Sequence, residues 1–81
     1  MTGVILYRLK SESKPVGIPF SGVAYFEVIH DPEDQFWYIR INASDGTYFQ
    51  LGRGSREYCE NKFQILYESM SENRSIDITD W

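Results

Sequence analysis

A chain of 81 residues has room for one domain, residues 1–81, and its formal net charge of −4 disfavours sequence-independent binding to a nucleic-acid backbone. Electrostatic docking on an anionic membrane is disfavoured for the same reason, and no apolar run approaches the ~20 residues that cross a bilayer. The aromatic content of 16% is unusual, and it suits either the half-buried face of a sheet or a binding surface.

The chain begins with a segment of alternating polarity. Residues 4–9 predict a strand that places Ile5, Tyr7 and Leu9 on one face. A polar loop follows and ends at a proline. We therefore expect the first strand to contribute one apolar face to the core.

Residues 16–22 contain two glycines and Pro19, which is typical of an irregular surface loop and not of a hydrogen-bonded strand. This loop carries two apolar residues, Ile18 and Phe20. Either they plug one end of the core or they form an exposed contact loop, and the plug is the favoured interpretation.

Three further strands are expected in the middle of the chain, at residues 23–30, 35–42 and 47–51. The segments between them, residues 31–34 and 44–46, are short and rich in turn-forming residues. The second contains Asp-Gly, which tolerates the positive φ of a tight hairpin. Together these segments predict an antiparallel meander.

Several residues in this region are candidates for chemistry. Asp31, Glu33 and Asp34 offer carboxylate oxygens, but they lack the length and the terminal glutamate of a calcium loop, so a solvated turn is favoured. His30 is the only histidine, and no nucleophile motif accompanies it. We therefore expect no metal, no cofactor and no enzymatic activity.

The clearest signal is a helix over residues 56–73, preceded by Ser55 as the N-cap and ended by Asn73 in a left-handed conformation. Its apolar residues recur at intervals of four, three and four, which defines one buried stripe. The stripe consists of Cys59, Phe63, Leu66 and Met70, and Ile65 and Tyr67 widen it. Because Cys59 lies on this stripe, a small core residue is favoured over a reactive thiol.

The segment before the helix, residues 52–55, has the sequence Gly-Arg-Gly-Ser. It is too short for a phosphate-binding loop and lacks the lysine that such a loop needs. A helix N-terminus beside Arg53 and Arg56 still suits one small anion. The favoured alternative is that the glycines only turn the chain from strand to helix.

Aromatic residues supply the strongest functional hypothesis. On the strands joined by the Asp-Gly hairpin, one face presents Tyr38 and Tyr48, and the other presents Trp37 and Phe49. Whichever face points outward can stack on a ligand, and the acidic chain favours a sugar or a protein over a nucleic acid. With Arg53 and Arg56 these four residues are the predicted ligand-binding residues.

Residues 75–81 alternate again and predict a final short strand. The expected order is β-β-β-β-α-β, an α+β fold with one amphipathic helix over a curved antiparallel sheet or a small oligomer-binding (OB-like) barrel. The polar side of the helix carries Glu60, Glu68 and Glu72, which are the predicted partner-binding residues.

This order is similar to the small oligomer-binding fold of bacterial AB5-toxin B subunits and their short relatives. The resemblance is carried by residues 37–41 on a central strand, by residues 48–51 before the helix, and by the helix-turn-strand segment 62–78. It implies a non-enzymatic, lectin-like subunit that forms a ring, with its helices lining a central channel.

Two functions follow as expectations. The first is an oligomeric carbohydrate-binding subunit of the toxin-B type. The alternative is a small acidic protein-interaction or inhibitor protein, for example from a phage or a bacterial accessory locus. A single cysteine and the absence of a recognisable leader favour the cytoplasm, with secretion as the alternative if a leader has been removed.

Overall fold

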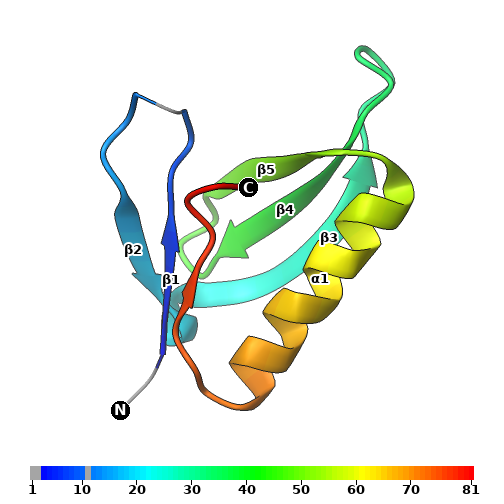
Figure 1. Ribbon diagram of the computed structural model, residues 1–81. Helices are drawn as coiled ribbons and strands as arrows, with labels where there is room; N and C mark the ends of the chain where they lie inside the picture. Colours follow the sequence, from blue (N-terminus) through cyan, green and yellow to red (C-terminus); the bar gives the residue numbers. More distant parts are fainter. Residues whose placement is uncertain (1–2, 11) are drawn as a thin grey trace.

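The computed structural model describes residues 3–10 and 12–81, which form an α+β fold, as predicted (Figure 1). The elements of this described part are β1 (Val4–Tyr7), β2 (Val16–Pro19), a short 3-10 helix η1 (Phe20–Gly22), β3 (Val23–His30), β4 (Trp37–Ala43), β5 (Tyr48–Gly54), α1 (Arg56–Ser71) and β6 (Ile76–Asp77). The strands pair in two three-stranded sheets, ordered β2-β1-β6 and β3-β4-β5. No closed barrel is found within these ranges, and the oligomer-binding resemblance stays a prediction.

The predicted antiparallel meander is confirmed as the sheet β3-β4-β5. Its first turn closes when the Asp31 N–H donates to the Phe36 carbonyl at 2.9 Å, so β4 begins two residues later than predicted. In the second turn Gly46 has a φ of +93°, which is the conformation that the Asp-Gly signal predicts.

The glycines before the helix lie inside a strand, which differs from the prediction that they turn the chain. β5 continues to Gly54, and α1 begins directly after Ser55. Gly52 has a φ of +73°, and the register of β4 against β5 shifts between Trp37 and Ile39. A left-handed glycine therefore makes a bulge that bends β5 toward the helix.

The prediction of an irregular loop over residues 16–22 is wrong. Residues Val16–Pro19 form β2, which pairs antiparallel with β1, and η1 follows. A proline is compatible with this strand because β2 is at the edge of its sheet, where one side needs no N–H donor. Phe20 is only 9% exposed, which confirms the interpretation that it plugs the core.

The helix agrees with its predicted stripe in part. Cys59 and Leu66 are fully buried, and Phe63 lies against Phe26 of β3 with ring centroids 4.7 Å apart. The prediction that Ile65 and Tyr67 widen the stripe is wrong, because these side chains are exposed on the solvent side.

Both predicted helix signals are confirmed. The Ser55 hydroxyl accepts from the Tyr58 N–H, and Asn73 has a φ of +56°. The helix ends at Ser71, two residues before the predicted limit, and Glu72 is the C-cap. None of the helices within residues 3–10 and 12–81 has the length and apolarity of a membrane span.

The two ends of the chain meet in the second sheet. β6 is shorter than predicted and pairs parallel with β1, while Ile78 just beyond it is buried. β1 ends at Tyr7, so the prediction that Leu9 faces the core is wrong, and Leu9 is exposed.

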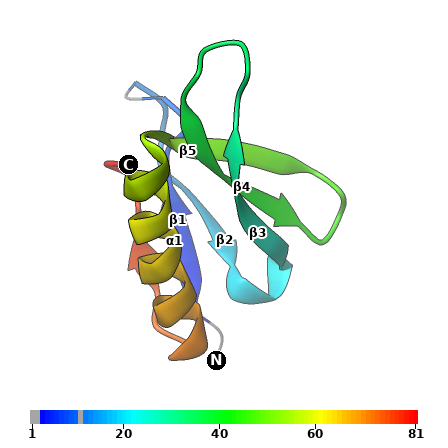
Figure 2. The same ribbon diagram turned by 90° about the vertical axis from the view of Figure 1, so that its right-hand side faces the viewer.

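A single hydrophobic core joins both sheets and the helix. In Figure 2, α1 and the sheet β2-β1-β6 lie on one side of the sheet β3-β4-β5. The buried residues of this core are Ile5, Phe20, Ile39, Ile41, Leu51, Cys59, Leu66 and Ile78. The opposite face of β3-β4-β5, which we call the outer face, points away from the core.

Candidate functional site

A row of side chains crosses the outer face. Tyr25 of β3 and Tyr48 of β5 both lie opposite Asn42 of β4 in the strand register. The two tyrosines are 57% and 59% exposed, so their rings are accessible to a ligand. Two inter-strand spacings place their backbones roughly 10 Å apart. We call these three residues the tyrosine row.

Polar side chains form the next row along the strands, where Glu27, Arg40 and Gln50 lie opposite one another. The Arg40 guanidinium is 3.7 Å from the Glu27 carboxylate and lies over the Tyr48 ring, 4.7 Å from its centroid. Within the described part of the chain, Arg40 Nε and Asn42 Nδ2 are shielded from solvent and have no hydrogen-bond partner. The outer face therefore combines two accessible rings with polar side chains that pack between them.

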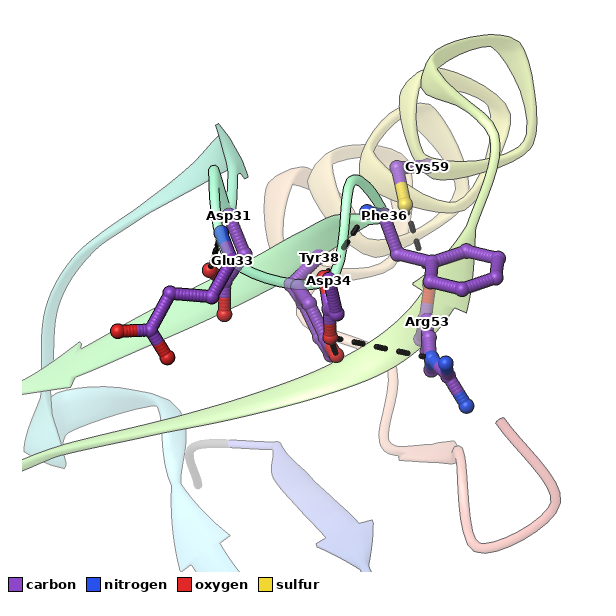
Figure 3. Close-up of polar contacts among 8 residues, drawn as sticks. Asp31, Glu33, Asp34, Phe36, Tyr38, Arg53 and Cys59 are labelled. Carbon is purple, nitrogen blue, oxygen red and sulfur yellow. Dashed lines mark hydrogen bonds and ion pairs between the residues drawn. The ribbon is translucent and has the colours of Figure 1, made fainter.

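A second cluster occupies the end of the outer face, at the β3–β4 turn. Figure 3 shows Asp34 between Tyr38 and Arg53. The Tyr38 hydroxyl donates to the Asp34 carboxylate, whose other oxygen accepts from the Phe36 N–H at 2.9 Å. Arg53 Nε is 4.0 Å from Asp34, and its guanidinium carbon is 3.9 Å from the centroid of the Phe36 ring. Two predicted ligand-binding residues, Tyr38 and Arg53, thus meet through Asp34.

The hydrogen bonds in this cluster stabilise the charged form of Asp34. Donation from Tyr38, and then from the Phe36 N–H, lowers the pKa of Asp34 below its ordinary value of 3.8. The same bond to Asp34 raises the pKa of the Tyr38 hydroxyl above its ordinary value of 10.0. Asp34 therefore remains an acceptor, and Tyr38 a donor, across the neutral pH range.

We predict a pH-dependent stability that depends on this bond. The unfolded chain protonates Asp34 more readily than the folded one, so the stabilisation is present above about pH 3.8 and is lost as the pH falls through the lowered folded pKa. Replacing Tyr38 with phenylalanine should lower the urea midpoint near pH 6 and should flatten its decline below about pH 4. Asp45 and Asp77 also have lowered pKa values, but they contribute equally to the pH dependence of the wild type and of the Tyr38→Phe variant. If the urea midpoints of the wild type and the variant changed in parallel with pH, the role of the Tyr38–Asp34 hydrogen bond would be contradicted.

The other predicted ligand-binding residues lie elsewhere. Phe49 is on the inner face, stacked on Tyr7 with ring centroids 4.0 Å apart, so it belongs to the core packing. Trp37 also packs against the core, between His30 at 4.9 Å and the Arg56 guanidinium at 5.4 Å. The structure therefore selects Tyr38 and Tyr48 as the outward pair and separates them from Trp37 and Phe49.

The three predicted partner-binding acids are all exposed on α1 or just after it. Glu60 pairs with Arg56 at 2.8 Å, Glu72 pairs with Arg74 at 2.7 Å, and Glu68 accepts from Gln64 at 3.2 Å. Glu60 lines a groove between α1 and β3, and neither Glu68 nor Glu72 contributes to this groove. The three acids therefore differ in their partners and do not form one shared binding surface.

Residues considered for chemistry in the sequence have structural contacts here. The Asp31 carboxylate accepts from the Glu33 N–H at 2.8 Å and so holds its own turn. Cys59 is buried, its thiol donates to the Gly52 carbonyl at 3.1 Å, and burial raises its pKa. In the described part of the chain, no group of three or more His, Cys, Asp or Glu residues is arranged to hold a metal ion.

Sequence reasoning did not identify Tyr25, Arg40 or Asn42 as site residues. The signal for Tyr25 was its alternation with Glu27, which marks the wetter face of the strand. Its place beside Asn42 and Tyr48 depends on the register of three strands, which the bulge between Val23 and Tyr25 shifts by one residue.

The assignment of a function to these surfaces rests on their own residues. No known protein family, no curated protein and no solved structure matches this chain.

Proposed function

We propose that the protein is a non-enzymatic binding module that holds a glycan across the outer face of β3-β4-β5. The observation that carries this proposal is the tyrosine row, in which two accessible rings flank one amide side chain. Aromatic rings stack on the apolar faces of sugar rings, and amide and guanidinium groups hydrogen-bond to hydroxyls. The row combines both kinds of group on one rigid sheet.

The surroundings favour an uncharged ligand of this kind. Arg40 is already paired with Glu27, so it offers directed donors without a strong excess of positive charge. The net charge of −4 disfavours a nucleic acid, whose affinity depends on positive charge. Binding of a neutral sugar does not depend on positive charge, so it is compatible with a surface on which Arg40 and Glu27 balance each other.

The oligomer-binding, toxin-B-like fold and its ring assembly belong to this proposal. The meander, the helix after it and the closing strand β6 support them, although β2 is a fifth strand before the helix where the resemblance has four. Size-exclusion chromatography with light scattering distinguishes a ring from a monomer. A strict monomer would remove the ring but would leave the tyrosine row as a binding surface.

We predict that Tyr25→Ala and Tyr48→Ala each weaken glycan binding by about fivefold to tenfold, because each removes one stacking platform worth about 1 kcal/mol. A panel of immobilised neutral oligosaccharides identifies the glycan, and calorimetry with that glycan gives the Kd. Tyr67→Ala is the matched control, because Tyr67 is 54% exposed but lies on α1. Retention of no oligosaccharide, or equal losses in all three variants, would overturn the proposal.

A further inference from the structure

β3 has an unpaired edge with a groove beside it. The strand pairs with β4 on one side, and no other strand within residues 3–10 and 12–81 pairs with its second edge. α1 runs alongside β3 (Figure 1), and the groove between them has a volume of about 490 Å³. Its lining residues are Phe26, Glu27, Val28, Glu60, Phe63 and Gln64. This groove lies on the helix side of the sheet and includes Glu27, whose side chain pairs with Arg40 on the outer face.

The other sheet edges carry features that discourage pairing with a further strand. β2 is four residues long and ends at Pro19, and β6 has two residues. β5 contains the bulge at Gly52 and the charged Arg53. β3 also has a bulge, between Val23 and Tyr25, and one charged residue, Glu27. Beyond the bulge, residues 25–30 form a regular strand that contains no proline, glycine or lysine. Proteins usually protect an edge of this length, so its openness points to a partner.

The backbone of β3 is oriented for such a partner. Because the Asp31 N–H donates to the Phe36 carbonyl, the alternation of an antiparallel ladder assigns residues 25, 27 and 29 to hydrogen bonds with β4. Phe26 and Val28 therefore direct their N–H and C=O groups to the open edge. Their side chains also line the groove, so one added strand would contact both.

The charges of the groove select its occupant. Glu60 lines the groove from α1. Its ion pair with Arg56 is exposed to solvent and therefore weak, so a cationic side chain of a partner can replace Arg56. A second copy of the chain would bring another acidic helix and another net charge of −4 to this edge. A basic segment meets no such repulsion. Charge complementarity thus favours a basic partner over self-association.

We propose that β3 binds an extended segment of a partner protein by strand addition, and that this segment alternates apolar residues with lysine or arginine. Its backbone pairs with Phe26 and Val28, its apolar side chains enter the groove against Phe63, and a basic side chain reaches Glu60. This surface matches the small acidic protein-interaction function expected from the sequence, and the proposal does not rest on glycan binding.

The test uses a blocked eight-residue peptide of alternating valine and lysine or threonine, which matches the length of β3. We expect binding by calorimetry and slowed hydrogen exchange at the amides of Phe26 and Val28. A peptide with glutamate in place of lysine should bind about tenfold more weakly. A peptide N-methylated on the residues that pair should not bind, and this probe leaves the protein itself unchanged.

Glu60→Gln should weaken binding of the lysine peptide by about threefold to tenfold, while Glu68→Gln and Glu72→Gln are matched controls that remove an equal charge outside the groove. Equal effects of the three substitutions, or undiminished binding of the N-methylated peptide, would overturn the proposal. So would failure of the unmodified peptide to bind, or a dimer whose protected amides are those of β3.

Discussion

Replacing Ile39 with alanine is expected to lower the free energy of unfolding by about 2–5 kcal/mol. Ile39 is fully buried on the central strand of β3-β4-β5, where it belongs to the core shared with the helix. Truncation removes buried methyl groups and leaves a cavity. The neighbouring side chains, among them Val28 and Leu51 on the adjacent strands, can fill this cavity only in part. A domain of 81 residues has a total stability of about 4–12 kcal/mol, so a large part of it would be lost.

The matched control is Ile65→Ala, which deletes the same atoms from a side chain that is 45% exposed on α1. We expect its free energy of unfolding to stay within about 0.5 kcal/mol of the wild-type value. Urea denaturation of both variants measures the difference. Similar losses in the two variants would show that the solvent side of α1 is covered in solution, which would contradict the burial described for this helix.

Local signals in the sequence were sufficient for the helix and the meander. The 3.6-residue stripe, the Ser55 cap and the Asp-Gly turn each act over a few residues, so their structural outcome depends little on the rest of the chain. Alternation alone placed Ile39 and Ile41 on one face of their strand, and the structure shows that this face is buried. These elements need only short-range information, and the structure confirms them.

The elements that the sequence did not predict depend on distant partners. β2 is a strand because β1 offers it an edge, even though its own residues include a glycine and a proline. β6 was predicted as a strand from its alternation, but its short extent and its parallel pairing with β1 depend on contacts across most of the chain length. Ile65 was predicted to lie in the core, but the apolar stripe does not show how much of the helix surface the neighbouring sheet covers.

The same distinction holds for the candidate site. The sequence identified Tyr38 and Tyr48 as alternating partners, but it did not determine which face points outward. It did not predict the contact of Asp34 with Tyr38, because that contact depends on the turn in which Gln35 has a φ of +66°. The groove beside β3 requires both the sheet order and the position of α1, which are properties of the whole fold.

Replacing Phe20 with alanine is expected to lower the free energy of unfolding by about 3–5 kcal/mol, because η1 then loses its only large buried side chain. The Phe20 ring packs so closely on Gly3 that a Cβ at Gly3 would lie 2.5 Å from it. The Phe20 N–H donates to the Gly3 carbonyl at 2.8 Å, and the Gly3 N–H donates to Asn73 at 2.9 Å. The Phe20 ring therefore packs where backbone hydrogen bonds join the start of β1 to η1 and to Asn73 after the helix.

Phe36→Ala is the matched control for this prediction, because Phe36 is 40% exposed and its main ring contact is with Arg53. Its loss should be about 1 kcal/mol or less, the size of an exposed cation–π contact. Hydrogen exchange separates the mechanisms further, since Phe20→Ala should speed exchange in β1 and at the end of α1 before the meander. If Phe20→Ala were as mild as Phe36→Ala, the ring would be an exposed contact and not the plug of the core. The larger loss is therefore expected for Phe20→Ala, because the Phe20 ring is buried in the core and the Phe36 ring is not.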